Sequence, residues 1–258
     1  MSSAPTTPPL PVDADVIARL KQLSSGTLTL QLFKRGLRQC FLVGLKPLNP
    51  LHARFAGEAF TLRFIPSRED IDTYATLTPY PNPDNLQWEA ADQIGPGQVL
   101  VVDSRNDVRG ASGGNLLLTH MMKKGVAAIV TDGALRDGAE IGVMAFPAYA
   151  RGITASTRLS FHHAADMQVP VSCAGVAVYP GDILVGDADG VTVVPRKFAV
   201  EIADDGEKQD ALEAYLALRL ETGEPLYGLY PPNDQTRADF DAWKKAGGKT
   251  SEAAAIRA

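Results

Sequence analysis

The feature that most constrains the fold is a strand–helix–strand pattern between residues 99 and 131. Segments 99–103 and 126–131 are apolar runs of strand length, and segment 113–124 between them has helical spacing and ends at Gly125. Two strands joined by one helix form a right-handed crossover and lie parallel in the same sheet. The pattern therefore predicts an α/β core in which both strands end at the same edge.

The segments on either side of this pattern predict additional strands that pair through hairpins. Segment 59–65 alternates apolar and polar residues, while 175–179, 183–186 and 191–194 are short apolar runs split by turn signals. Asp189-Gly190 suits a tight hairpin. Hairpins beside a parallel crossover predict a mixed sheet.

The N-terminal part of the chain predicts a tail and two helices. Residues 1–12 are rich in Pro, Ser and Thr, which is typical of a flexible segment. A helix is expected over 13–23 with Asp13 as its cap, and a second over 28–35 with Thr27 as its cap.

The C-terminal part predicts a long amphipathic helix and an irregular extension. The helix covers about 198–220, and the aromatic, proline-rich segment after it has little regular pattern. We therefore predict a tail at 1–12, a main domain at 13–220 and an extension at 221–258. Residues 66–90, which are polar and contain four prolines, are expected to be a long loop that serves as a lid or wall.

Charge and composition exclude several classes of protein. A net charge of -5 argues against non-specific binding of nucleic acid, and Lys34, Arg35 and Arg38 are expected to form a solvated helix face. No apolar run approaches the length of a membrane span, and the N-terminus lacks the features of a signal peptide. Cys40 and Cys173 make no metal motif and are interpreted as reduced and buried. A cytoplasmic protein is expected.

The first candidate for binding is the start of the helix after Gly113-Gly114. Glycines before a helix leave backbone N–H groups approachable, and such a helix start attracts a carboxylate or phosphate. The preceding strand places it at the carboxyl edge of the sheet, where ligands bind in α/β folds. The alternative is an ordinary loop-to-helix junction capped by Ser112.

The second candidate is segment 132–137, Asp-Gly-Ala-Leu-Arg-Asp, at the end of the next strand. The planar fork of Arg136 can grip a carboxylate or keto-acid oxygens, and Asp137 offers a hard oxygen ligand to a magnesium-type ion. Together they suit a metal-chelated 2-oxo acid. The alternative is a surface turn in which the two side chains pair with each other.

Other polar residues are weaker candidates. His162-His163 has no partner at metal-ligand spacing, and His120 is interpreted as structural or as facing another subunit. Residues 104–107 follow a strand to the same edge. Four charged residues near the long loop are candidates for contacting the distal part of a substrate: Arg63, Arg68, Glu69 and Asp70.

Taken together, these motifs resemble the RraA-like family. The resemblance rests on Gly113-Gly114-Asn115-Leu116, the run 124–133, Arg136-Asp137 and the run 175–182 followed by Asp187, Asp189-Gly190-Val191 and Pro195. It covers roughly residues 20–210. Members of the family include regulators of ribonuclease E activity and class II 4-hydroxy-4-methyl-2-oxoglutarate/4-carboxy-4-hydroxy-2-oxoadipate aldolases.

The resemblance implies a swivelling β/β/α fold and a ring of three or six copies, whereas the C-terminal helical extension lies outside the common family pattern. It also implies a site in which Arg136 binds pyruvate and Asp137 binds Mg²⁺ or Mn²⁺. Backbone amides of Gly114, Asn115, Leu116 and Leu117 would hold the pyruvate carboxylate. The regulators tend to lack the aspartate of the pair, so Asp137 favours an enzyme.

Two departures from the family pattern concern acidic residues. Asn115 stands where some aldolases have an acidic residue that holds water on the metal. An acidic residue of a neighbouring subunit assists in the family, and Glu201, Asp204 and Asp205 are the candidates here.

The expected function is a divalent-metal-dependent lyase that cleaves a 4-hydroxy-2-oxo acid to pyruvate, with decarboxylation of oxaloacetate as a side activity. The alternatives are a non-catalytic regulator that binds ribonuclease E, and a sugar-acid aldolase or dehydratase on the same scaffold.

Overall fold

The computed structural model describes residues 12–77, 82 and 85–248. The chain divides into two compact units, Met1–Ile202 and Ala203–Ala258, and the division falls within helix α7 (Ala199–Glu221). The boundary predicted from the sequence, at 220/221, lies at the other end of the same helix.

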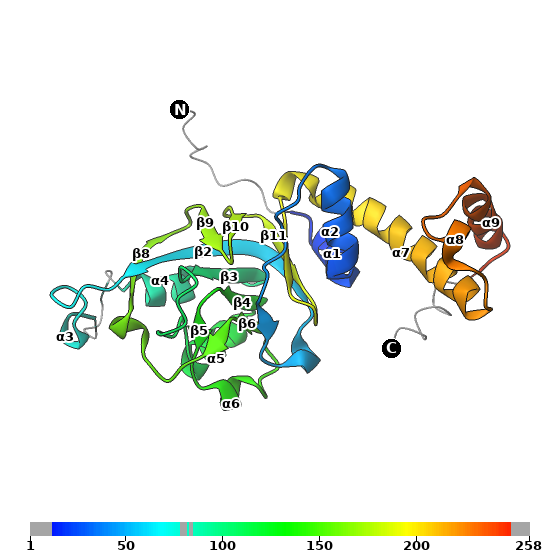
Figure 1. Cartoon of the computed structure of the whole chain (residues 1–258). Coiled ribbons are helices and arrows are strands. Elements are labelled where there is room, and N and C mark those ends of the chain that lie inside the picture. Colours follow the sequence, from blue (N-terminus) through cyan, green and yellow to red (C-terminus); the bar gives the residue numbers. More distant parts are fainter. Residues whose placement is uncertain (1–11, 78–81, 83–84, 249–258) are drawn as a thin grey trace. The chain divides into compact units, whose positions relative to one another are not determined.

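The first unit is built around one mixed sheet (Figure 1). Four neighbouring strands in it are parallel: β2 (Phe55–Pro66), β3 (Gln98–Asp103), β4 (Ala128–Thr131) and β6 (Ala148–Ala150). Antiparallel strands complete it: β1 (Lys46–Pro47) beside β6, β8 (His162–Met167) and β11 (Ile183–Gly186) beside β2, and β12 (Val191–Val194) beside β11. The predicted crossover and the predicted mixed sheet are both confirmed.

The central strands are apolar throughout because both faces of the sheet are covered. Leu100 and Val102 of β3 enter one buried cluster, with residues of helices α4 (Leu86–Gln93), α5 (Asn115–Lys123) and α6 (Gly138–Ile141). Val99 and Val101 enter a second cluster, with residues of the hairpin β9 (Val171–Cys173) and β10 (Val176–Val178). Alternate residues of a strand point to opposite faces, so the layers are hairpin, sheet and helices. This is the expected β/β/α arrangement.

Two further helices belong to this unit. Helix α1 (Ala14–Gln22) begins after Asp13, whose side chain accepts a hydrogen bond from Asp15 N, as predicted. Helix α2 (Ser25–Lys34) begins three residues earlier than predicted. Its cap is Ser24, which accepts from Thr27 N, so the assignment of Thr27 as the cap is wrong. From the sequence alone, either hydroxyl residue could cap the helix. In the structure Thr27 is buried inside the first turn.

Two regions expected to be irregular contain helices. Segment 66–90 holds α3 (Tyr74–Leu77) and the beginning of α4, so it is not one long loop. Its Pro79, Pro81 and Pro83 lie outside the described residues. The C-terminal unit contains α8 (Leu226–Leu229) and α9 (Asp234–Lys245), where Asn233 caps α9 by accepting from Thr236 N. Its small core combines two aromatic and two leucine side chains: Tyr215, Leu216, Leu229 and Phe240.

The remaining short elements complete the description. Strands β5 (Ala134–Leu135) and β7 (Gly152–Ile153) form a separate parallel pair beside the edge where β3 and β4 end. Both cysteines are free and buried, as expected. Within the described residues, no helix combines the length and the apolar character needed to cross a bilayer.

Candidate active site

The two loops singled out in the sequence meet at the carboxyl edge of β3 and β4. Ser112 N donates to Ala134 O at 2.7 Å, and Arg136 N donates to Gly113 O at 3.0 Å. These bonds hold the loop before α5 against the loop after β4. The structure thus brings the glycine pair and the Arg-Asp pair into one place.

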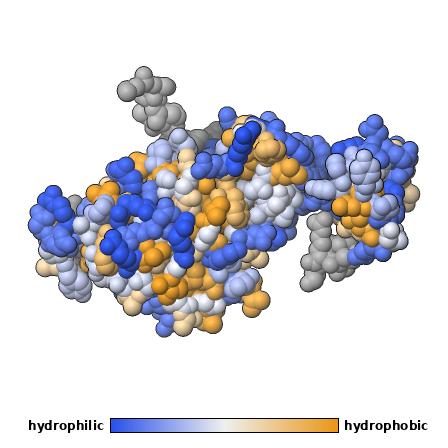
Figure 2. Space-filling model, viewed as in Figure 1, coloured by the Kyte–Doolittle hydropathy of each residue, from blue (hydrophilic) through white to orange (hydrophobic). Residues whose placement is uncertain are grey.

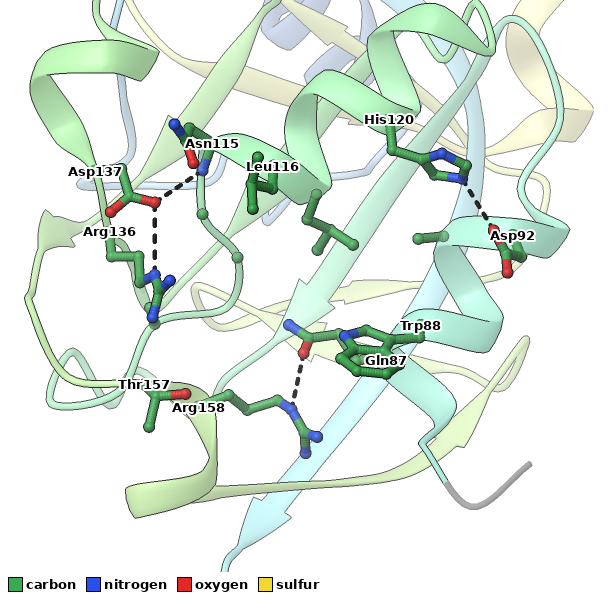
Figure 3. A pocket seen from close by; sticks show the side chains of 15 residues that line it. Gln87, Trp88, Asp92, Asn115, Leu116, His120, Arg136, Asp137, Thr157 and Arg158 are labelled. Atoms are coloured by element: carbon green, nitrogen blue, oxygen red, sulfur yellow. Dashed lines mark hydrogen bonds and ion pairs between the residues drawn. The ribbon is translucent and has the colours of Figure 1, made fainter. Parts of the chain in front are cut away.

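Asp137 is the centre of this arrangement (Figure 3). Its Oδ2 accepts a hydrogen bond from Asn115 N at 3.0 Å and lies 3.5 Å from Arg136 Nε. The residue has φ 62° and ψ 44°, the left-handed conformation, which Asp tolerates better than most residues. This backbone conformation turns the carboxylate back toward the start of α5. Its side chain is 30% exposed, so it remains reachable from solvent.

Gly114 is required by the close approach of the two loops. A Cβ atom at this position would lie 2.6 Å from Asp137 Oδ2 and 3.0 Å from Arg136 Nε. Its φ of -137° is open to any residue, so the requirement is space rather than backbone conformation. The glycine therefore allows the carboxylate to reach the helix start.

Helix α5 begins without a side-chain cap. Gly114 is its N-cap and has no side chain to accept from the first turn, where only the amide of Asn115 has a side-chain acceptor among the described residues, Asp137 Oδ2. The Ser112 hydroxyl instead bonds to Ser104 Oγ and Thr131 Oγ1, both at 2.7 Å, in a buried cluster beneath the loops. The alternative in which Ser112 caps the helix is therefore wrong. The amides of Leu116 and Leu117 have no acceptor among the described residues, and such amides attract an anion.

Asp132 holds the backbone beneath the site by hydrogen bonds and does not line the cavity. It is fully buried, and its oxygens accept from Ser104 N at 2.7 Å, Asn106 N at 3.1 Å and Ala174 N at 3.2 Å. Burial raises the pKa of this carboxyl, while the hydrogen bonds from the backbone oppose the shift. Of the two aspartates in segment 132–137, only Asp137 faces the ligand side.

A cavity of about 510 Å³ lies over this arrangement. All six residues predicted for the site line it: Gly114, Asn115, Leu116, Leu117, Arg136 and Asp137. The side chain of Leu116 is 80% exposed, whereas Leu118 and Met121 are the buried residues of α5.

The cavity has a second wall that sequence reasoning missed. It is formed by Gln87, Trp88 and Asp92 of α4 and by Thr157 and Arg158 of the loop after β7. His120, at the C-terminal half of α5, also lines the cavity and its Nε2 lies 2.9 Å from Asp92 Oδ1. The one available signal was the helical pattern of 86–93, which the surrounding prolines obscured.

Arg158 is the most buried charged residue of that wall, with 5% exposure. Its Nε donates to Gln87 Oε1 at 2.9 Å, Nη1 to His162 O at 3.2 Å and Nη2 to Asn85 Oδ1 at 3.2 Å. Burial lowers its pKa to about 10, and the nearby Asp72 opposes the shift. The guanidinium is therefore charged at neutral pH.

Several predicted contacts lie elsewhere. Arg63 pairs with Asp166, and Arg68 pairs with Asp70 at 2.7 Å, and neither these residues nor Glu69 line the cavity. His162 is fully buried and stacks on Phe64, whereas His163 Nδ1 lies 2.5 Å from Asp72 Oδ1. Neither His162 nor His163 lines the cavity.

The residues present fit a hydrated divalent ion. No group of three or more His, Cys, Asp or Glu side chains converges within the described part of the chain. Asp137 Oδ1, however, has no hydrogen-bond donor among the described residues, and the cavity leaves room for water around it. Mg²⁺ commonly keeps several waters and takes one or two carboxylates, so Asp137 is a suitable anchor.

Comparison with known proteins identifies the family. The sequence model of the RraA-like family, described as Aldolase/RraA, matches residues 14–193. A Halalkalibacterium halodurans protein, provisionally named 4-hydroxy-4-methyl-2-oxoglutarate aldolase, is 37% identical over 131 residues, which is 50% of this chain and 61% of that protein. A Xanthomonas campestris protein with the same provisional name is 36% identical over 45% of this chain and 69% of its own length.

A solved structure agrees with the family model. Streptomyces coelicolor RraAS2, described as an unusual member of the RNase ES inhibitor RraA protein family, superposes with a TM-score of 0.70 and 30% identity. The match covers 81% of this chain and 98% of that one. Sequence, fold and the meeting of the two loops therefore agree, and the chain belongs to the RraA-like family.

Proposed function

We propose that this protein is a divalent-metal-dependent lyase that cleaves a 4-hydroxy-2-oxo acid to pyruvate by retro-aldol chemistry. The observation that carries the proposal is the grouping of Asp137, Arg136 and the α5 start around one cavity. The aldolase names of the relatives support the same class of reaction.

The residues of the chain would divide the work as follows. The first-turn amides of Leu116 and Leu117 bind the C1 carboxylate, because a helix start favours negative charge. Arg136, whose side chain is 45% exposed, bonds the same carboxylate and the 2-oxo oxygen. Asp137 would hold Mg²⁺ or Mn²⁺, since its Oδ1 is not used by the hydrogen bond from Asn115 N.

Breaking the C3–C4 bond leaves its electron pair on the pyruvyl half as an enolate, while the 4-hydroxyl proton passes to water in the cavity as the new carbonyl forms. A proton from water then adds to C3 of the enolate and gives pyruvate. When bound, the ion supplies Lewis-acid stabilisation of the negative charge on the 2-oxo oxygen. Arg136 adds a fixed cation at the same oxygen, and it needs no reorganisation because Asp137 already positions it. Decarboxylation of oxaloacetate generates the same enolate, so it is expected as a side activity.

The deciding experiment measures pyruvate release from oxaloacetate and from 4-hydroxy-4-methyl-2-oxoglutarate with Mg²⁺ present. Release is expected with either substrate and should stop on addition of EDTA. Because Mg²⁺ alone decarboxylates oxaloacetate slowly, the D137N variant at the same Mg²⁺ concentration is the matched control. Equal rates for the two proteins, on both substrates, would rule out the proposed lyase.

The similarity to RraAS2 favours a second candidate, a regulator that binds a ribonuclease. A regulator needs no open cavity around Asp137, whereas the lyase does. Ribonuclease E activity should be measured with and without the protein, beside the pyruvate assay. Inhibition without pyruvate release would assign the chain to the regulators.

A ring of three or six copies is part of the proposal. Figure 2 shows apolar side chains among the polar ones on the viewed face of the first unit. The most exposed large aliphatic residues of this unit, each more than 60% exposed, are Val43, Leu51, Leu116 and Val143. Apolar groups of this kind mark interfaces when they lie together. Light scattering coupled to size exclusion will give the number of copies.

A further inference from the structure

A second cavity, of about 350 Å³, lies at the edge of the sheet where the parallel strands begin. Its base is formed by buried residues near the amino ends of three of them: Phe55 at the start of β2, Val126 before β4 and Phe146 before β6. The candidate active site lies at the opposite edge, where β3 and β4 end. Among the described residues none lines both cavities, so they are separate sites.

Three basic residues from three different segments line this second cavity. Lys21 belongs to the last turn of α1, His52 to the short 3-10 helix Pro50–His52, and Arg54 directly precedes β2. All three are exposed. No acidic residue of the described part of the chain lines the cavity, although the whole sequence has 30 acidic and 25 basic residues. The cavity is therefore a positive region of an acidic protein, and such a region attracts anions.

Arg54 is oriented by the end of helix α1. Its Nη1 donates to Lys21 O at 2.9 Å and to Gln22 O at 3.0 Å, where a cation also interacts favourably with the helix dipole. These bonds use two of the five N–H donors of the guanidinium. The three donors on Nε and Nη2 have no acceptor among the described residues. The helix end thus fixes the guanidinium and leaves one of its edges available.

That available edge is the one that holds a carboxylate elsewhere in this chain. Arg68 Nε donates to Asp70 Oδ1 at 2.8 Å, and Arg68 Nη2 donates to Asp70 Oδ2 at 2.7 Å. Two parallel bonds of this kind are the usual way in which an arginine binds a carboxylate or a phosphate. Arg54 can therefore bind an oxyanion in the same way without moving away from α1.

The other two basic residues have no competing partner. Within the described part of the chain, neither the Lys21 ammonium nor the His52 ring has a hydrogen bond or an ion pair. Residues 1–11, which precede α1, contain no acidic side chain that could neutralise them. Like charges gathered at one cavity repel one another, so an anion with more than one charge is favoured over a monovalent one.

We propose that this second cavity binds a small multivalent oxyanion, with Arg54 as its bidentate anchor and Lys21 and His52 as further donors. Polycarboxylates and phosphate compounds share this chemistry, and the volume of about 350 Å³ is in the range of small-molecule sites. The site is distinct from the one assigned to the lyase reaction, and the inference does not depend on that reaction.

Isothermal titration calorimetry with citrate and with pyrophosphate tests the site and distinguishes the two classes of anion. Metal-free buffer is used because both anions chelate Mg²⁺. At least one of them is expected to bind the wild-type protein with a Kd below about 1 mM, and the tighter of the two gives the class of ligand. Acetate, which carries a single charge, should bind at least about tenfold more weakly.

Two variants should weaken this binding at least about tenfold, as expected when a charge-assisted hydrogen bond is lost. R54Q removes the anchor, and K21E places a negative charge at the cavity. K245E is the matched control for K21E, because Lys245 is also an exposed lysine in the last turn of a helix and does not line the cavity. K245E should change the affinity less than about twofold. Because Lys21 is exposed, K21E still decides the question if R54Q fails to fold.

R136A locates the bound anion, since it removes the arginine of the other cavity. It should leave the affinity within about twofold of the wild-type value. Loss of binding in R136A would place the anion in the candidate active site and overturn the proposal. Equal weakening by K21E and K245E, acetate binding as tight as that of the multivalent anions, or no binding of either citrate or pyrophosphate would overturn it as well. None of these results bears on the lyase proposal, which is tested by pyruvate release.

Discussion

Asp137 Oδ2 and the backbone N–H of Asn115 are joined by a 3.0 Å hydrogen bond across 22 residues of sequence. The bond fixes the carboxylate at the start of α5 and connects the two loops that follow neighbouring parallel strands. It uses one carboxylate oxygen and leaves the other toward the cavity. The same side chain can therefore organise the site and hold an ion.

Replacing either member of the Arg-Asp pair should stop catalysis without unfolding the protein. D137N keeps a residue type that tolerates φ 62° and can still accept from Asn115 N, but it removes the charge. R136A removes the cation at the developing oxyanion. Pyruvate release should fall at least about a hundredfold in each, as when one oxyanion-stabilising group is lost. Circular dichroism is the control, and unfolding of both variants would indicate a structural pair.

G114A should reduce activity because its methyl group would occupy the space of the Asp137 carboxylate. The added Cβ lies 2.6 Å from Oδ2, so Asp137 or the loop must shift, at a cost of about 1–3 kcal/mol in stability. Metal affinity and pyruvate release are expected to fall together. G26A is the matched control, since the nearest atom to its Cβ is 3.6 Å away. Wild-type activity in G114A would show that the close approach is not needed.

N115D should strengthen metal binding. Asn115 lines the cavity at the first position of α5, where a negative charge also interacts favourably with the helix dipole. A second carboxylate beside Asp137, whose Oδ2 accepts from Asn115 N, would raise the negative charge available to the ion. Titration with Mn²⁺ should give about tenfold tighter binding, since ligand charge sets affinity for such ions. An unchanged or weaker affinity would place Asn115 outside the metal shell.

The sequence was sufficient to predict the half of the site formed by local elements. Strands β3 and β4 and helix α5 are consecutive, so their order alone brings Gly114 and Asp137 to one edge. The other wall could not be predicted in this way. Arg158 and Gln87 are 71 residues apart, and their bond depends on how α4 packs on the sheet. The prolines around 79–83 also made α4 look like part of a loop.

Asp132 should matter for stability rather than for chemistry. Its two oxygens satisfy three backbone N–H groups in a fully buried position. D132A would leave these donors unpaired and should lower the free energy of unfolding by roughly 3 kcal/mol or more, whereas D132N keeps one acceptor and should lose less. Urea unfolding measures both. A loss below about 1 kcal/mol in D132A would mean that water replaces the carboxylate.

His162 should make the protein less stable as the pH falls below neutrality. Burial lowers the pKa of this imidazole, and the Arg105 cation lowers it further. Nε2 lies 3.2 Å from Gly110 O, and Nδ1 lies 3.0 Å from Arg105 Nη2, so the neutral ring donates from Nε2 and accepts at Nδ1. A proton on Nδ1 would face the arginine.

The direction in which stability changes with pH follows from this lowered pKa. Between the folded-state pKa and the unfolded value near 6.5, the unfolded chain binds more protons, so stability rises with pH and is lost as the pH falls through that window. In H162Q, where the side chain does not titrate, the free energy of unfolding should depend less on pH between about 6.5 and 5. H52Q, which changes an exposed histidine, should keep the wild-type dependence. Identical curves for H162Q and the wild-type protein would show that His162 is protonated in the folded state as readily as in the unfolded chain.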